Sequence, residues 1–132
     1  MKIPQTIIDG IITHAREGYP YEVCGLMAGK DGVVTKAFRT TNTDESSVSY
    51  MMDPTEQFSA LKDMRIEGLE LMAIYHSHPT SPAYPSQTDV RLAFYPEASY
   101  IIISLQKVAS PEIKGYRIVD GKITGEVLEV IP

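Results

Sequence analysis

The chain has 132 residues, of which 43% are hydrophobic and 22% charged, as in a globular protein long enough to bury a core. A net charge of -5, with no cluster of Lys and Arg, argues against a nucleic-acid partner. The single cysteine cannot form an internal disulfide, no apolar run approaches the roughly 20 residues of a membrane-spanning helix, and Met1–Gln5 lacks the apolar core of a signal peptide. We therefore expect one domain, residues 1–132, without a membrane partner and in a reducing cytoplasm.

The first part of the chain is typical of a helix followed by strands. Apolar residues recur at helical spacing over about residues 4–18, which predicts an amphipathic helix. Residues 21–28 and 33–39 have the composition of two strands, joined by the Gly-Lys-Asp-Gly turn between them into a hairpin. After the polar stretch 40–47, apolar residues alternate over 48–52, which predicts a third strand.

Two shorter helices are expected further on. Asp53, followed by Pro54 and Glu56, has the form of a helix N-terminus. The buried face of this helix is expected to consist of Phe58, Leu61 and Met64. The next helix should run from Ser86 to about Phe94 and end before the next proline.

The remaining segments are apolar or β-branched enough to be strands. They are a strand over 69–78 that carries two histidines, an inner strand over 99–106, and a hairpin of 113–119 and 123–130 around Asp120-Gly121. The order of elements indicates an α+β fold in which one strongly curved mixed sheet is flanked by helices.

The chain is organised around His76-Ser77-His78-Pro79. In an extended backbone, side chains alternate between faces, so His76 and His78 project to the same side while Ser77 points away. Asp89 is the candidate for a third metal ligand once the intervening loop folds back. Two histidines and a carboxylate with a vacant fourth position match a catalytic zinc site, because structural zinc sites use four protein ligands. Each part alone is weak evidence, since Ser86 and Asp89 also fit an ordinary helix start.

Two further potential ligands are interpreted differently. His14 lies toward the edge of the apolar stripe of the first helix, with no second ligand at a matching offset, so we expect a surface or boundary histidine. Cys24 shares a strand face with Glu22. Three roles are open for it: it borders the site, it replaces a water ligand there, or it is a buried core thiol, which is the commoner role of a free cysteine.

Taken together, these residues resemble the JAMM, or MPN-plus, family of zinc metalloproteases. The resemblance lies in an upstream glutamate, Glu22, then His76-Ser77-His78-Pro79, six further residues, and Ser86-Gln87-Thr88-Asp89. It extends to Pro20-x-Glu22-x-Cys24-Gly25-Leu26-x-x-Gly29, which is similar to the strand that carries the family's catalytic glutamate. Such a resemblance implies a single MPN domain with a fold similar to that of cytidine deaminases.

The resemblance also implies roles for individual residues. One zinc ion per chain would be held by His76, His78, Asp89 and a water. Glu22 would act as general acid and base, and Ser86 would steady the tetrahedral intermediate. Without the downstream motif, we would interpret Glu22 as an exposed residue at the start of a strand, and Ser86 as a helix cap alone.

The family's peptidases cleave peptide or isopeptide bonds after the C-terminal glycines of ubiquitin and similar proteins. This chain more closely resembles the small standalone bacterial members, which are associated with sulfur-carrier proteins. The resemblance therefore implies hydrolysis after the terminal Gly-Gly of a ubiquitin-like or sulfur-carrier protein.

Two other functions are weighed against this one. A non-catalytic MPN-type binding scaffold would not need the complete ligand set and the glutamate that this chain has. A zinc deaminase would need paired cysteines with a histidine, and the chain has one cysteine. So small a domain is also compatible with a homodimer, although the sequence locates no interface.

Overall fold

The computed structural model describes all 132 residues, which form eight strands and three helices. In chain order these are β1 (Lys2–Pro4), α1 (Gln5–Gly18), β2 (Cys24–Lys30), β3 (Val33–Thr40), α2 (Pro54–Ile66), β4 (Glu70–His78), α3 (Gln87–Arg91), β5 (Ser99–Ser104), β6 (Glu112–Val119), β7 (Lys122–Glu126) and β8 (Glu129–Ile131). No helix combines the length and the apolar character that crossing a membrane requires.

All eight strands belong to one mixed sheet in the order β7-β6-β5-β4-β2-β3-β1-β8. Strand β1 is parallel to β3 and to β8, and β4 is parallel to β5, whereas the other neighbours are antiparallel. The two edge strands, β7 and β8, are separated by only two residues in the chain. Residues 127–128 can join the two edges because the sheet curls and brings its ends together, which confirms the predicted curvature.

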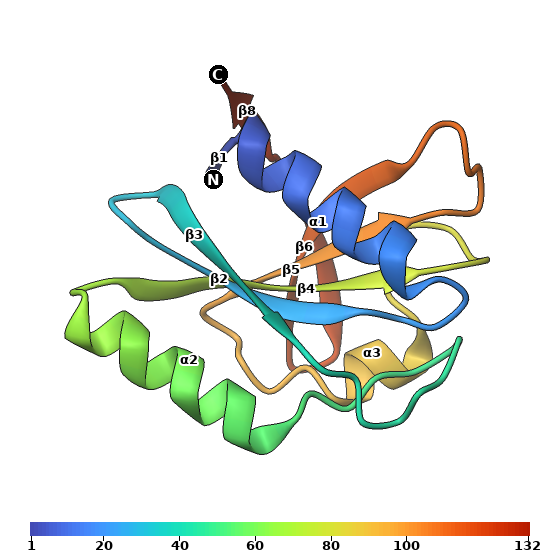
Figure 1. Cartoon of the computed structure of the whole chain (residues 1–132), viewed down its shortest axis with the longest axis horizontal. Helices are drawn as coiled ribbons and strands as arrows, with labels where there is room; N and C mark the ends of the chain where they lie inside the picture. Colours follow the sequence, from blue (N-terminus) through green and yellow to red (C-terminus); the bar gives the residue numbers. More distant parts are fainter.

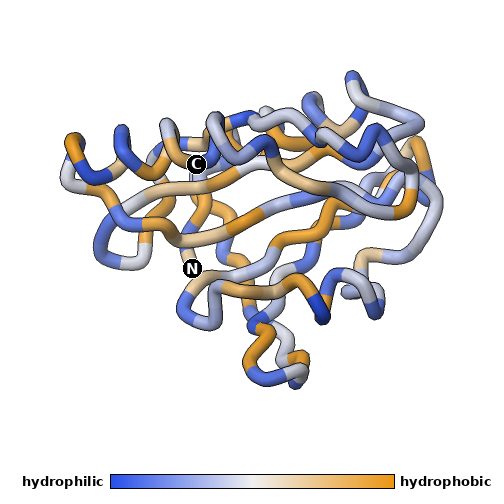
Figure 2. The backbone as a smooth tube through the Cα atoms, turned by 90° about the horizontal axis from the view of Figure 1, so that it is seen from below, coloured by the Kyte–Doolittle hydropathy of each residue, from blue (hydrophilic) through white to orange (hydrophobic).

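Helices cover both faces of the sheet (Figure 1): α1 lies on one side, and α2 and α3 lie on the other. The apolar core is divided accordingly. Ala73 and Tyr75 of β4 pack with residues of α1, whereas Ile74 packs with Ala60 and Met64 of α2. Hydrophobic stretches run along the strands inside the molecule, and many outer turns are hydrophilic (Figure 2). Because side chains alternate along β4, the two histidines lie on the same face as Ile74.

Most of the predicted elements are present, with their ends shifted by a few residues. The predicted strand over 48–52 is wrong, because this segment forms only a single bridge between Asn42 and Met52. The predicted strand over 123–130 is divided into β7 and β8, at opposite edges of the sheet. The three-residue strand β1 was not expected from the sequence.

The predicted buried face of α2 is only partly correct. Asp53 does cap this helix, since its side chain accepts hydrogen bonds from the N–H groups of Thr55 and Glu56. Met64 is buried, but the side chain of Phe58 is 68% exposed. The helix rests on the sheet through Ala60 and Met64, four residues apart, and this contact turns Phe58 toward solvent.

Candidate metal centre

Three side chains expected to bind metal converge at the C-terminal end of β4. His76 and His78 are buried, with side chains 1% and 3% exposed, and Asp89 reaches them from α3. The two Nε2 atoms are 3.1 Å apart. The Oδ2 atom of Asp89 is 3.1 Å from Nε2 of His76 and 3.0 Å from Nε2 of His78. The structure thus brings together one ligand atom from each predicted residue.

A hydrogen bond at the far side of the His78 ring determines which of its nitrogens is free. Nδ1 of His78 lies 2.8 Å from the carbonyl oxygen of Pro82. A carbonyl can only accept, so Nδ1 carries the proton and donates it. The lone pair of Nε2 then points toward Asp89, as in metal-binding histidines whose other nitrogen is held by a carbonyl.

The short helix α3 fixes the position of Asp89. Ser86 is its N-cap, and its hydroxyl accepts a hydrogen bond from the N–H of Asp89 at 3.0 Å. In return, Oδ2 of Asp89 accepts the N–H of Ser86 at 2.9 Å, which completes a capping box. The predicted cap is confirmed, and it holds the carboxylate against the histidines.

Glu22 reaches the same place from the segment just before β2, which is paired with the histidine strand. Strands β2 and β4 are antiparallel, with Cys24 opposite His76, and the N–H of Ser77 donates to the carbonyl of Val23 at 3.0 Å. This register, continued by two residues, places Glu22 opposite His78 and on the same face. Ser77 points to the other side, where its hydroxyl accepts the N–H of Val23 at 2.9 Å. The strand pairing required for a catalytic role of Glu22 is therefore present.

Burial sets the protonation of Glu22, and hydrogen bonds set that of Asp89. Glu22 is 4% exposed and its Oε1 has no hydrogen-bond partner. Burial raises the pKa of Glu22 to about 8, against the lowering effect of the nearby His78. The pKa of Asp89 is lowered, because hydrogen bonds from both histidines and from Ser86 outweigh burial. In the protein without metal, Glu22 holds a proton at neutral pH and Asp89 is ionised.

The pKa values of the two histidines are shifted in opposite directions. Burial lowers the pKa of His76 more than Asp89 raises it. Burial also disfavours the charged form of His78, but hydrogen bonds to Asp89 and Pro82 outweigh it and raise the pKa of this side chain. A proton between His78 and Asp89 is therefore favoured in the metal-free protein, and a bound metal ion would take its place.

Zinc fits this arrangement. Ligand atoms about 2.0–2.1 Å from a tetrahedral zinc ion are about 3.3 Å from one another, close to the 3.0–3.1 Å separations found here. When the His78 ring is neutral, with its proton on Nδ1, its Nε2 lone pair faces the ionised carboxylate oxygen of Asp89, and two acceptors meet unless a proton or a metal ion lies between them. A bound cation resolves that conflict, and two nitrogens with one oxygen form a common zinc ligand set.

Two residues near the site were not identified from the sequence. Tyr50, expected in a strand, stacks on the ring of His76 with 4.8 Å between ring centroids and 29° between planes. Ser77, which was expected only to point away from the metal, connects β4 to the backbone beside Glu22. A lone tyrosine after a polar stretch carries no local signal for such a contact, because the contact depends on the path of the 41–53 segment.

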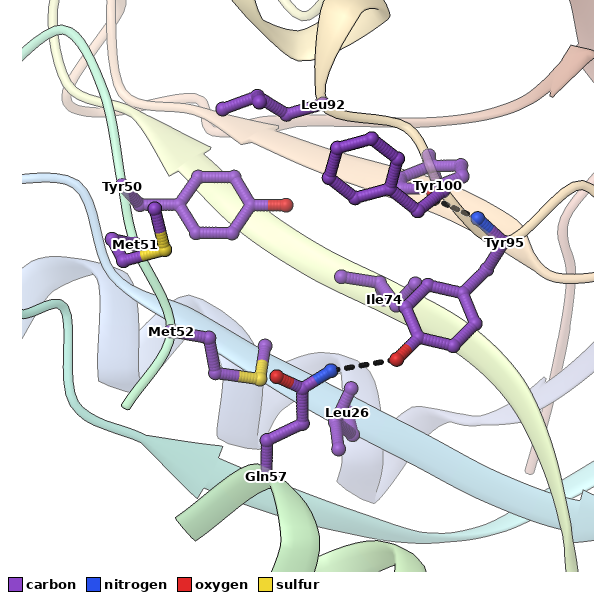
Figure 3. A pocket seen from close by; sticks show the side chains of 10 residues that line it. Leu26, Tyr50, Met51, Met52, Gln57, Ile74, Leu92, Tyr95 and Tyr100 are labelled. Carbon is purple, nitrogen blue, oxygen red and sulfur yellow. Dashed lines mark hydrogen bonds between the residues drawn. The ribbon is translucent and has the colours of Figure 1, made fainter. Parts of the chain in front are cut away.

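An apolar pocket lies beside the metal ligands, and Tyr50 forms part of its wall (Figure 3). Its volume is about 120 Å³, enough for one apolar side chain, and nine of its ten lining residues are hydrophobic. Gln57 is the polar exception, and its amide donates to the hydroxyl of Tyr95 at 2.8 Å. Since Tyr50 also contacts His76, the pocket adjoins the metal centre.

The other residues considered from the sequence lie outside the ligand set. His14 is half-buried, as expected for a boundary histidine, with its Nδ1 2.7 Å from the hydroxyl of Tyr75. Cys24 is a buried core thiol whose Sγ lies 3.3 Å from Oγ1 of Thr40. Burial raises the pKa of Cys24 to about 11, so the thiol stays protonated at neutral pH.

Comparisons with known proteins identify the family of this chain. A model of prokaryotic homologues of the JAB domain matches residues 4–119. A CysO-cysteine peptidase of Mycobacterium tuberculosis is 36% identical over 127 residues, which cover 95% of this chain and 87% of the relative. A desampylase of Haloferax volcanii is 41% identical over 103 residues, which cover 73% of this chain and 74% of that protein.

Solved structures show the same fold. The solution structure of a protein from Desulfitobacterium hafniense superposes with a TM-score of 0.90 at 38% identity, covering 99% of this chain and 93% of the other. A JAB1/MPN domain protein from Archaeoglobus fulgidus, with a TM-score of 0.66 and 21% identity over 100% of both chains, shares the fold. The chain therefore belongs to the family of prokaryotic JAB-domain homologues, in agreement with the JAMM resemblance of its motifs.

Proposed function

We propose that this protein is a zinc metallopeptidase that hydrolyses the peptide or isopeptide bond after the C-terminal Gly-Gly of a ubiquitin-like or sulfur-carrier protein. The observation that carries the proposal is the contact between His78 and Asp89. Their ligand atoms are 3.0 Å apart, and the Pro82 carbonyl fixes the free lone pair of His78 toward the carboxylate. A structural scaffold has no need of such a buried arrangement.

The residues around this centre would divide the reaction among them. Bound zinc would supply a Lewis acid that polarises the scissile carbonyl and makes a nucleophile available near neutral pH. Glu22 would accept the proton of the attacking water and pass it to the leaving amine. Its buried Oε1, which has no partner, is free for that transfer.

Ser86 is suited to stabilise charge on the substrate. Its Oγ accepts the N–H of Asp89, so its own hydrogen is free to donate. A donor to a developing oxyanion typically contributes about 2.7–4 kcal/mol of transition-state stabilisation. The capping role and the catalytic role are compatible, because the cap fixes where this hydroxyl lies.

The proposed substrate class follows from the relatives and from the site. The two relatives compared above are named a CysO-cysteine peptidase and a desampylase, and a third, from Thermus thermophilus, a probable TtuB-protein conjugate cleaving protease. A Gly-Gly terminus has no side chains to exclude from a narrow site. The apolar pocket beside Tyr50 would take an apolar side chain of the carrier.

The test combines metal content with cleavage. Zinc per chain is measured by elemental analysis on protein purified without chelator, and the protein is then incubated with Gly-Gly-terminated carrier fusions. We expect about one zinc per chain and cleavage after Gly-Gly that stops when a chelator is added. A native protein that takes up no zinc when supplied with it, or a loaded protein that leaves every such fusion intact, would contradict the proposal and favour the binding scaffold. Light scattering on the same sample tests whether the protein forms a homodimer.

A further inference from the structure

The two histidine ligands are supported differently on the side away from the metal. His78 has a hydrogen bond from Nδ1 to the Pro82 carbonyl. Nδ1 of His76 is buried and has no hydrogen-bond partner. Metal-binding histidines usually donate their second ring N–H to a carbonyl or carboxylate, which fixes the orientation of the ring. His76 lacks that support, so another contact must hold its ring.

That contact is the stack with Tyr50. The two rings lie 4.8 Å apart at 29°, close to parallel, whereas the rings of His76 and His78 are tilted by 59°. A stacked aromatic ring opposes rotation of the imidazole about its Cβ–Cγ bond. Tyr50 is itself half-buried against the apolar pocket, so its ring has little freedom to move away.

The Asn42 side chain binds the backbone on both sides of Tyr50. Asn42, the only asparagine of the chain, uses its amide group on both neighbours of Tyr50: it donates to the carbonyl of Ser49 at 3.1 Å and accepts the N–H of Met51 at 3.0 Å. The same amide nitrogen donates to the carbonyl of Glu22 at 3.0 Å. Asn42 therefore links the Tyr50 segment to the strand of the candidate general base.

We propose that Tyr50 is a positioning residue for His76, and that Asn42 acts through Tyr50 by fixing the segment on either side of it. The proposal rests on the proposed zinc site and concerns how that site is kept in shape. It explains why the 48–52 segment alternates like a strand but does not join the sheet. Asn42 binds the carbonyl of Ser49 and the N–H of Met51 instead, while Thr43 binds the Met51 carbonyl. In this arrangement Tyr50 stacks on His76.

The first experiment compares three substitutions at adjacent positions. Tyr50→Leu removes the aromatic ring, Tyr50→Phe keeps the stack, and Met51→Ala alters the pocket wall beside Tyr50 without losing the backbone groups that Asn42 binds. Zinc affinity is measured by competition with a chromophoric chelator, and the His76 imidazole is followed by ¹⁵N NMR in the zinc-loaded protein. Thermal unfolding of the metal-free variants shows whether each one folds.

We expect Tyr50→Leu to bind zinc about 10-fold or more weakly, as for other losses of support to metal-ligating histidines, and to shift or broaden the His76 ring signals. Tyr50→Phe and Met51→Ala should keep both the parental affinity and the parental signals. A folded Tyr50→Leu protein with unchanged affinity and unchanged ring signals would overturn the proposal, as would an equal loss in Met51→Ala. If the native protein binds no zinc at all, it is the proposed function that fails.

The second experiment asks whether Asn42 acts through Tyr50. Asn42→Ala removes the hydrogen bonds to both neighbours of Tyr50 and should also weaken zinc binding, with the same change in the His76 signals. In a Tyr50→Leu background the substitution should have little further effect, because coupled residues are non-additive. If the losses of zinc affinity in the two single variants add fully in the double variant, Asn42 acts independently of Tyr50, which would contradict this part of the proposal. Asn42→Ala also tests the inference if Tyr50→Leu does not fold.

Discussion

The proton on Nδ1 of His78 is held by the carbonyl of Pro82, 2.8 Å away, and this contact makes Nε2 a ligand atom. The carbonyl is in the loop between the histidine strand and α3, so the segment that joins the ligands also sets the tautomer of one of them. The loop is tied down in turn: Ser104 donates to the carbonyl of Ser81 at 2.6 Å, and the hydroxyl of Tyr116 to that of Ala83. Strands β5 and β6 thus hold the loop in place, and β5 also pairs with the histidine strand, with Ile102 opposite His76 and Ser104 opposite His78.

The first prediction concerns Asp89→Asn. The amide keeps an oxygen that can cap α3, but it removes the negative charge that holds the cation between two neutral imidazoles. We expect zinc affinity to fall by more than about 10-fold, measured by chelator competition. Asp53→Asn is the control, because the Asp53 carboxylate also accepts backbone hydrogen bonds at a helix start, as the N-cap of α2, and is not part of the metal-ligand cluster. Equal zinc binding by Asp89→Asn and the native protein would remove Asp89 from the ligand set.

The second prediction concerns Glu22→Gln. The amide preserves the shape of the side chain but cannot accept the proton, so hydrolysis should fall by roughly 10²- to 10⁴-fold while zinc stays bound. The measurements are kcat on a Gly-Gly-terminated fusion and zinc per chain on the same sample. Glu17→Gln, at an exposed side chain paired with Arg39, should leave both unchanged. Parental turnover in Glu22→Gln would assign the proton transfer to another group.

The third prediction uses the pKa of Glu22 in the metal-free protein. Burial raises it from the ordinary 4.5 to about 8. Between these values the folded state keeps a proton that the unfolded state has lost, so the free energy of unfolding falls as pH rises through this window. The metal-free Glu22→Gln protein has no such pH dependence. The difference between its free energy of unfolding and that of the native protein should therefore increase from pH 5 to pH 8.

Urea unfolding of both metal-free proteins at several pH values measures this difference. The curves should diverge with increasing pH above about 4.5 and become parallel above the folded-state pKa. A constant difference across that range would show that Glu22 is ionised in the folded protein. With zinc bound, the nearby cation favours the carboxylate, so the divergence should shrink.

The ligands could be predicted from the sequence because their relation is local. Two histidines separated by one residue share a face of any strand, and Ser86 and Asp89 fit one turn at a helix start. The position of Glu22 depends on the pairing of β2 with β4, which spacing alone does not determine. The resemblance to a family supplied that relation, and the observed register agrees with it.

The wrong predictions concern segments whose structure depends on residues far away in the sequence. Val48, Tyr50 and Met52 alternate as in a strand, but the Asn42 side chain binds the backbone around Tyr50 instead. Strand β1 has three residues, too few for a periodic signal, and it exists because β3 and β8 lie on either side of it. Phe58 has the hydrophobicity of a core residue, but the small side chain of Ala60 is what lets α2 approach the sheet.

The last prediction concerns the packing behind the histidine strand. Gly25 of β2 lies opposite Tyr75 of β4, and a Cβ atom at Gly25 would come within 2.3 Å of the tyrosine ring. Tyr75 is fully buried and its hydroxyl is hydrogen-bonded to His14, so the ring cannot move away without breaking that contact. Gly25→Ala should therefore destabilise the protein by about 1–3 kcal/mol or more, as overpacking of a core does.

Gly10 provides the opposite case in the same chain. It lies within α1, and a Cβ atom there would meet nothing within 4 Å. Gly10→Ala should stabilise the protein by about 0.5–1 kcal/mol, because alanine loses less conformational entropy in a helix. Urea unfolding of both variants checks the pair. Since Tyr75 precedes His76, Gly25→Ala should also weaken zinc binding, whereas Gly10→Ala should not. A Gly25→Ala protein as stable as the native one would show that the two strands can separate at this point without cost.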